Sequence, residues 1–112
     1  MYKLFGIPNC NTVKNARNYL DAEKISYEFI NFKKYTPTDS DIRNWAKVFG
    51  GRPINKAGLT YRRHKEKYES LSDEGKVKFI QTNPSIIKRP ILLKHATIVA
   101  FGFDEEKYSE LI

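Results

Sequence analysis

The spacing of apolar residues along the chain predicts short strands that alternate with amphipathic helices. Val13, Ala16 and Leu20 recur at intervals of three and four residues, which is typical of one face of a helix over 12–23. Four short segments rich in apolar, β-branched or aromatic residues are expected to be strands: 2–6, 26–32, 90–93 and 97–101. His95-Ala96 is expected to form the tight turn of a hairpin between the last two strands.

The segment between the second and third strands is expected to be helical. Three helices are expected there, over 38–49, 59–68 and 72–82. Thr38 or Ser40 is the expected cap of the first, Gly50-Gly51 its end, and Asn83-Pro84 the end of the third. Their expected inward positions are Ile42, Trp45, Val48, Phe49, Leu59, Tyr61, Tyr68, Val77, Phe79 and Ile80. A last helix is expected from the cap Asp104 to Ile112.

The order of these elements predicts an α/β fold with a mixed four-stranded sheet. A helix that links the first two strands favours a parallel pair, because a crossover connection returns the chain in the same direction. The last two strands form an antiparallel hairpin. We find no repeat, low-complexity tract or linker, so we expect a single domain over 1–112, with a helical insertion at 37–84.

The charge balance favours anionic partners. The formal net charge is +7 and the sequence pI is about 9.5, which suits a nucleic acid, an anionic small molecule or an acidic protein surface. Basic residues are concentrated between Arg43 and Lys67. This run has two readings, solvated helix faces or a patch that faces an anion or a partner.

The hydropathy pattern argues against a membrane protein. No apolar stretch approaches the roughly 20 residues that span a bilayer, and the N-terminus lacks the apolar core of a secretory signal. We therefore expect a cytoplasmic protein. The single cysteine, Cys10, cannot form an intrachain disulfide, so disulfide chemistry would need a thiol from another molecule.

Cys10 lies where a helix is expected to begin. The first N–H groups of a helix have no intrahelical partner, and together with the helix dipole they favour thiolate over thiol. Lys14 and Arg17, one and two turns further on, are expected to add positive potential. The alternative reading is a small buried cysteine that closes the junction between strand and turn.

Two motifs resemble the arsenate reductase (ArsC)/Spx family of the thioredoxin superfamily, and most of all its small YffB-type members. They are Gly6-Ile-Pro-Asn-Cys10-Asn-Thr near the start and Asn83-Pro84-Ser-Ile-Ile-Lys-Arg89-Pro90-Ile91 near the end. The resemblance implies a thioredoxin-like (glutaredoxin-like) fold with a helical insertion.

The resemblance also implies roles for individual residues. Cys10 matches the nucleophile, Arg89 matches an arginine that binds the oxyanion and the thiolate-bound intermediate, and Pro90 matches a cis-proline beside the thiol. Arg89 and Pro90 are thus the expected substrate- or glutathione-binding residues. In this scheme Asn11, Thr12 and Lys14 would stabilise the thiolate. The Thr12 hydroxyl has two readings, a donor to the sulfur or an ordinary bond to the backbone.

Three departures from the family pattern limit what is carried over. Asn55 stands where a first arginine is expected, and Phe101-Gly102-Phe103 carries no arginine where another is expected. Loss of two charge-assisted contacts, each worth roughly 1.5–3 kcal/mol, leaves arsenate reduction undecided. Val13 stands where a second cysteine would complete a Cys-x-x-Cys switch.

We therefore expect an enzyme with Cys10 as its nucleophile and no bound cofactor. It would be a glutathione-dependent thiol reductase, or an oxyanion reductase of the arsenate type, with glutathione as the thiol co-substrate. The alternative is a Spx-like regulator that binds RNA polymerase; direct nucleic-acid binding is a third, weaker option. His64 and His95 lack metal-ligand spacing with Cys10, so we expect no metal site. We expect a monomer.

Overall fold

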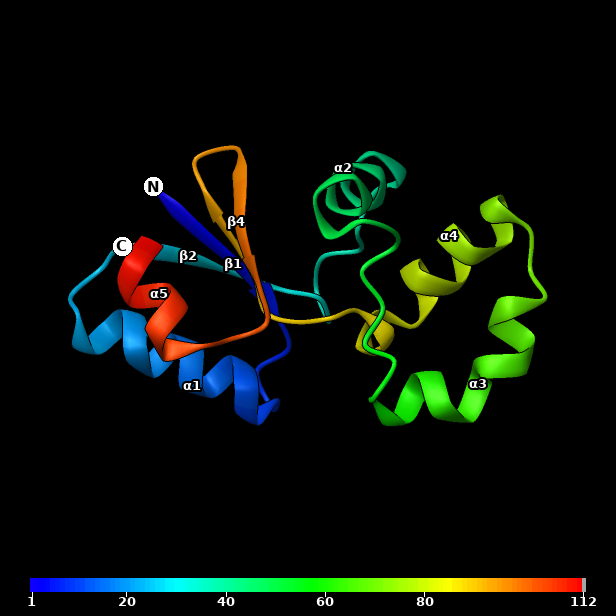
Figure 1. The fold of residues 1–112 in the computed structure, drawn as a ribbon, viewed down its shortest axis with the longest axis horizontal. Helices are drawn as coiled ribbons and strands as arrows, with labels where there is room; N and C mark the ends of the chain where they lie inside the picture. The colour runs from blue at the N-terminus through cyan, green and yellow to red at the C-terminus, as the bar shows by residue number, and fades with distance from the viewer. Residues whose placement is uncertain (112) are drawn as a thin grey trace. The chain divides into compact units, whose positions relative to one another are not determined.

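The computed structural model describes residues 1–111, so Ile112, the end of the last expected helix, lies outside the described residues. Figure 1 shows the order of the elements along the chain. The strands are β1 (Tyr2–Gly6), β2 (Tyr27–Asn31), β3 (Ile91–Lys94) and β4 (Thr97–Phe101). The α-helices are α1 (Asn11–Ala22), α2 (Asp39–Phe49), α3 (Leu59–Glu69), α4 (Asp73–Thr82) and α5 (Glu105–Leu111), and a 3-10 helix, η1, spans Pro84–Ile86.

The chain forms two compact units. The first, here called the thiol unit, comprises Met1–Tyr35 and the chain from Arg89 onward; the second, here called the helical unit, is Thr36–Lys88. The helical unit begins and ends near the bounds of the insertion expected at 37–84. The assignment of 1–112 to one domain stays a prediction.

The thiol unit is built on a four-stranded mixed sheet with the order β2-β1-β3-β4. Strand β1 pairs with β2 in parallel and with β3 in antiparallel, and β3 and β4 form the antiparallel hairpin. His95 lies in the hairpin turn with a positive φ of 56°. The mixed sheet, its parallel pair and its hairpin are therefore confirmed.

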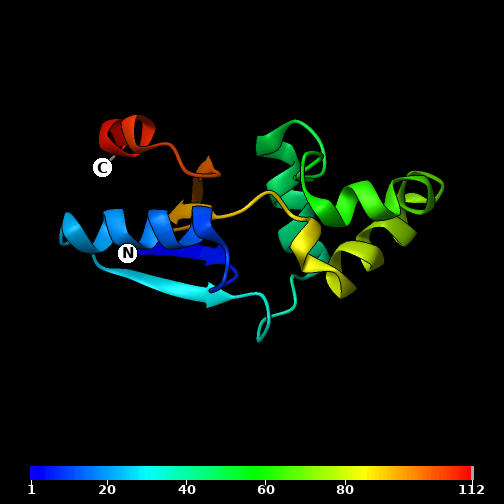
Figure 2. The same ribbon diagram turned by 90° about the horizontal axis from the view of Figure 1, so that it is seen from below.

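Helices α1 and α5 cover the same face of this sheet (Figures 1 and 2). Alternate residues of a strand point to one face, so Leu4 and Leu92 reach the helices from neighbouring strands. They pack with Leu20 of α1 and Tyr108 of α5, and all four side chains are fully buried. This apolar layer fixes α1, and with it the position of Cys10, on the central strands.

Side-chain caps begin two helices of the helical unit, α2 and α4, and a glycine ends α2. The Thr38 hydroxyl accepts a hydrogen bond from the Asp41 N–H at 3.0 Å, and the Asp41 carboxylate accepts one from the Thr38 N–H at 3.1 Å. Gly50 closes α2 in the left-handed region, with a φ of 87°. Ser72 caps α4 by accepting a hydrogen bond from the Gly75 N–H at 3.1 Å.

Three of the expected inward positions in this unit are wrong. Val48, Phe49 and Leu59 are 58%, 40% and 56% exposed, whereas Ile42, Trp45, Tyr61, Tyr68, Phe79 and Ile80 are buried. Val48 and Phe49 occupy the last turn of α2, and Leu59 is the first residue of α3. At helix ends the apolar spacing continues although the helix has left the packed layer, which explains the error.

Candidate active site

Cys10 is carried on the turn between the centre of the sheet and α1. Its N–H donates to the Ile7 carbonyl at 3.3 Å, and its carbonyl accepts from the Lys14 N–H at 2.9 Å as the first helical bond. Gly6 allows the close approach of strand and helix, since a Cβ there would lie 2.8 Å from Val13 Cγ2. The strand, the turn and the first turn of α1 thus hold the sulfur in one place.

Cys10 is the N-cap of α1 and remains half-buried. Its side chain closes no regular cap hydrogen bond to residues 1–111, and the first turn of α1 carries no acidic residue. Burial alone would raise the pKa of the thiol. The N–H groups of Val13 and Thr12 and the charge and donors of Arg89 outweigh burial, so the pKa of Cys10 lies below its ordinary value.

Arg89 reaches Cys10 because β1 and β3 are antiparallel neighbours. Phe5, near the end of β1, pairs with Ile91 at the start of β3, so the residues that follow β1 and those that precede β3 share one end of the sheet. The guanidinium of Arg89 contributes both a charge and a hydrogen bond to the thiolate. Two segments far apart in sequence therefore build one site.

The Arg89–Pro90 peptide bond is cis, as expected, and the role of Pro90 in binding substrate or glutathione stays a prediction. Pro90 is buried, and its carbonyl accepts a hydrogen bond from the Gly102 N–H at 2.8 Å. Gly102 has a φ of 77°, a conformation that a residue with a Cβ rarely adopts. The loop after β4 thereby fixes the proline beside the site.

The sequence-predicted residues contribute unequally to the sulfur's environment. Thr12 acts through its backbone N–H, and the largest favourable contribution comes from the N–H of Val13, which the sequence reading missed. A helix position three residues after an N-cap ordinarily directs its N–H at the cap, and that signal could have identified Val13. Among the described residues, Asn11 and Lys14 are exposed and are not among the groups that lower this pKa, so their role stays a prediction.

Neither histidine joins the thiol site. The Nδ1 atom of His95 lies 3.0 Å from the N-terminal amine, and the His64 ring contacts Phe79 with its centroid 5.8 Å away. No group of three or more His, Cys, Asp or Glu side chains among residues 1–111 is placed to hold a metal ion. In the same residues, no helix is long and apolar enough to cross a bilayer.

Comparisons with known proteins agree with the motifs and the fold. A structure described as a YffB protein is 31% identical, with a TM-score of 0.82 over 98% of this chain and 97% of that one. A possible arsenate reductase from Streptococcus mutans UA159 is 32% identical, with a TM-score of 0.73 over 92% of this chain and 91% of the other. An uncharacterised protein of Haemophilus influenzae is 30% identical over 96% of both chains.

The expected α/β, thioredoxin-like fold is confirmed by these structural neighbours together with the sheet order. The ArsC family model matches residues 5–111, which contain both motifs and every residue of the thiol site. The chain belongs to the ArsC family.

Proposed function

We propose that this protein is a glutathione-dependent thiol reductase that uses Cys10 as its only nucleophile. The observation that carries the proposal is the half-buried Cys10 sulfur, whose pKa is lowered by the α1 N-terminus and by Arg89. A thiolate is the nucleophilic form of cysteine, and a depressed pKa makes it abundant near neutral pH. Arg89 offers a planar fork of donors that suits a carboxylate on the substrate.

The reaction would proceed in two exchange steps. The Cys10 thiolate attacks the glutathione sulfur of a mixed disulfide R–S–S–G; the S–S bond breaks, a Cys10–glutathione disulfide forms, and R–S⁻ leaves and takes up a proton. A second glutathione, as thiolate, then attacks the glutathione sulfur bound to Cys10. Oxidised glutathione leaves, and Cys10 returns as thiolate. The cycle consumes one glutathione thiol: R–S–S–G and one glutathione become R–SH and oxidised glutathione, and the outside thiol takes the place of the second cysteine that this chain lacks.

A second candidate is reduction of an oxyanion such as arsenate at the same thiolate. It is supported by Arg89 at the sulfur and by the solved relative described as a possible arsenate reductase. The thiolate would displace water from arsenate, and two glutathione molecules would become one oxidised glutathione as arsenite forms. Asn55 and the segment Phe101-Gly102-Phe103, where further arginines are expected, provide no charge for a trianion.

The test measures thiol alkylation against pH and reduction of a glutathione mixed disulfide. We expect an alkylation midpoint below the roughly 8.5 of free cysteine, and no disulfide reduction by Cys10→Ser. Arg89→Ala should move the midpoint to higher pH, because it removes a positive charge that favours the thiolate. Lys14→Ala is the matched control, since its side chain is exposed on the same helix end, and it should move the midpoint less.

Parallel assays with arsenate separate the two candidates. Disulfide reduction without arsenate reduction would support the thiol reductase. A thiol pKa near the free-cysteine value together with no exchange would overturn both, and binding to purified RNA polymerase would then support the regulator.

A further inference from the structure

The helical unit contains a cavity of about 600 Å³ whose walls are unusually basic. Four of its lining residues are cationic, namely Arg52, Lys56, Lys76 and Lys88, and Glu69 is its acidic one. The four cationic residues come from three separate segments: the chain after α2, helix α4 and the residues after η1. The cavity lies wholly within Thr36–Lys88, and neither Cys10 nor Arg89 lines it.

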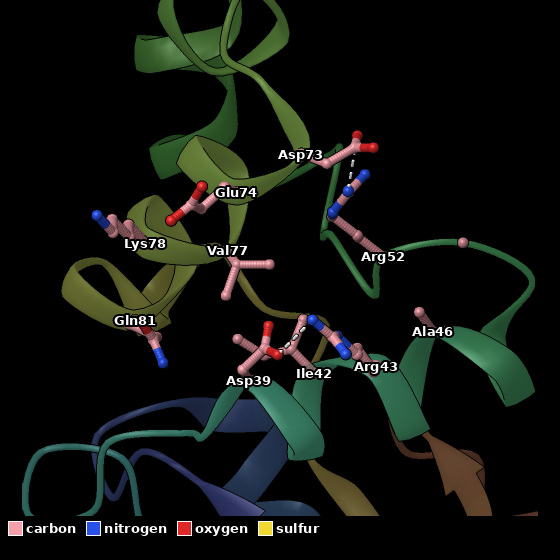
Figure 3. A pocket seen from close by; sticks show the side chains of 11 residues that line it. Asp39, Ile42, Arg43, Ala46, Arg52, Asp73, Glu74, Val77, Lys78 and Gln81 are labelled. Carbon is pink, nitrogen blue, oxygen red and sulfur yellow. Dashed lines mark hydrogen bonds and ion pairs between the residues drawn. The ribbon is translucent and has the colours of Figure 1, made fainter.

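A neighbouring cavity of about 800 Å³ in the same unit provides a comparison (Figure 3). There the acidic and basic side chains are equal in number, and two pairs are in contact. Arg43 and Asp39 lie 2.7 Å apart, and Arg52 and Asp73 lie 3.0 Å apart. Dashed lines mark both pairs in Figure 3. The formal charges of the side chains that line that cavity sum to zero, so they do not favour binding of an anion.

The three lysines of the basic cavity are not neutralised in this way. Neither of the two ion pairs just named includes Lys56, Lys76 or Lys88. Glu69 accepts a hydrogen bond from the Tyr61 hydroxyl at 3.4 Å. Lys76 Nζ lies 5.6 Å from the centre of the Tyr68 ring, a contact that keeps its charge. The cavity thus retains an excess of ammonium groups.

The remaining wall is mostly apolar and includes the polar Asn55. Phe49 is 40% exposed although it continues the apolar face of α2, and it lines the cavity with the buried Ile54 and Tyr68. An exposed aromatic ring in a wall that also carries cations suits a ligand with an apolar or planar part and an anionic head. The volume falls in the range of roughly 300–1,000 Å³ that is typical of small-molecule sites.

We propose that this cavity binds a small organic phosphate, with the phosphate held by Lys56, Lys76 and Lys88 and the organic part against Phe49. Lysine ammonium groups bind phosphate as point charges from several directions, which fits donors drawn from three segments. Arg52 is engaged by Asp73 and supplies positive potential at the edge. The lining residues all belong to the helical unit, and binding there requires no electron transfer.

The experiment titrates phenyl phosphate and inorganic phosphate into ¹⁵N-labelled protein carrying Cys10→Ser, which removes the reactive thiol from the assay. We expect amide shifts concentrated at residues 49–57, 68–69, 76 and 88, and tighter binding of phenyl phosphate than of inorganic phosphate. Benzoate, with a carboxylate in place of phosphate, should bind more weakly than phenyl phosphate.

Variants distinguish this site from general attraction to a basic protein. Lys76→Gln and Lys88→Gln should each weaken phenyl phosphate binding by about ten- to a hundredfold, because a charge-assisted contact is worth roughly 1.5–3 kcal/mol and about 1.4 kcal/mol is tenfold. Lys65→Gln, with the same charge change on an exposed face of α3 outside the cavity, should change it less than about twofold. Phe49→Ala should remove the preference for phenyl phosphate and leave inorganic phosphate binding unchanged.

Equal weakening by Lys65→Gln, shifts confined to residues 6–14 and 89–90, or no saturable shift would each overturn the proposal. Since the assay uses a protein without its nucleophile, these outcomes are independent of whether the thiol reductase activity exists.

Discussion

Helices α1 and α2 begin in opposite ways, and the difference separates a structural helix start from a reactive one. At α2, Thr38 and Asp41 exchange two hydrogen bonds, and Asp39 and Asp41 place negative charge in the first turn. At α1, no acid occupies the first turn, and Cys10 closes no regular cap bond to the described residues. At the α2 start the Asp41 N–H is bonded to the Thr38 hydroxyl, whereas at the α1 start the N–H groups of Thr12 and Val13 act on the Cys10 sulfur.

A fully capped helix end is stable and chemically inert, because its positive potential is already neutralised. The α1 end gives up that stabilisation, and the same potential lowers the pKa of the Cys10 thiol instead. Three substitutions test this contrast, ordered from the largest expected effect to the smallest.

Gly6→Ala should damage the α1 start most. The new Cβ would lie 2.8 Å from Val13 Cγ2, and Val13 is fully buried with a stiff β-branched side chain. We expect a loss of about 1–3 kcal/mol in the free energy of unfolding, typical of overpacking, measured by urea denaturation. Displacement of the Val13 N–H should also raise the thiol pKa, which alkylation against pH would detect.

The double substitution Gly6→Ala/Val13→Ala isolates the cause. Removing the two γ-methyl groups relieves the clash, so Val13→Ala should cost less in the Gly6→Ala background than in the parent protein. Additive costs would show that Gly6 acts through something other than this contact.

Thr38→Ala should cost about 1 kcal/mol of stability, the usual cost of losing a side-chain cap. The thiol pKa should not move, since Thr38 belongs to the helical unit and is not among the groups that act on Cys10. Ser40→Ala, two residues further along in the first turn of α2, is the matched control and should leave the stability almost unchanged. A shift of the Cys10 alkylation midpoint in Thr38→Ala would contradict the separation of the two helix starts.

Asn11→Asp would give α1 the acidic first turn that α2 already has. The helix should gain about 0.3–1 kcal/mol from the dipole. The same carboxylate repels the thiolate, so the pKa of Cys10 should rise and the alkylation midpoint should move to higher pH. Asn15→Asp, also exposed but one turn later, should produce smaller changes of both kinds. If Asn11→Asp did not raise both the stability and the pKa of Cys10, the claim that the α1 start gives up stability for a lower thiol pKa would be contradicted.

The sequence was sufficient for the elements whose signals are local. Thr38, Gly50 and Ser72 cap or close helices as their residue types predict, and the His95-Ala96 turn joins a hairpin. Apolar spacing was a weaker guide at helix ends. It assigned Phe49 to the interior, whereas the ring is exposed in the basic cavity, because periodicity along one helix carries no information about what faces it.

At the thiol site, the sequence predicted the reactive residues but not which atoms act on the sulfur. Cys10 at a helix start and a cis bond before Pro90 followed from motifs. The sequence predicted that N–H groups at the helix start favour the thiolate, and the structure identifies them as those of Thr12 and Val13. Backbone donors have no residue-type signature, so the sequence did not single out Val13; the role of the exposed Lys14 stays a prediction.

The pairing of Phe5 with Ile91 makes the alignment of the reactive groups a property of the sheet. Successive residues of a strand point to opposite faces, so a slip of β3 by a single residue would turn Ile91 and its neighbours over and carry Arg89 away from the sulfur. Such a slip would also expose Leu92, which is fully buried. A sequence change that preserves the packing of this layer therefore also preserves the register that places Arg89 near Cys10. A chain that folds with this core packed has its reactive groups aligned.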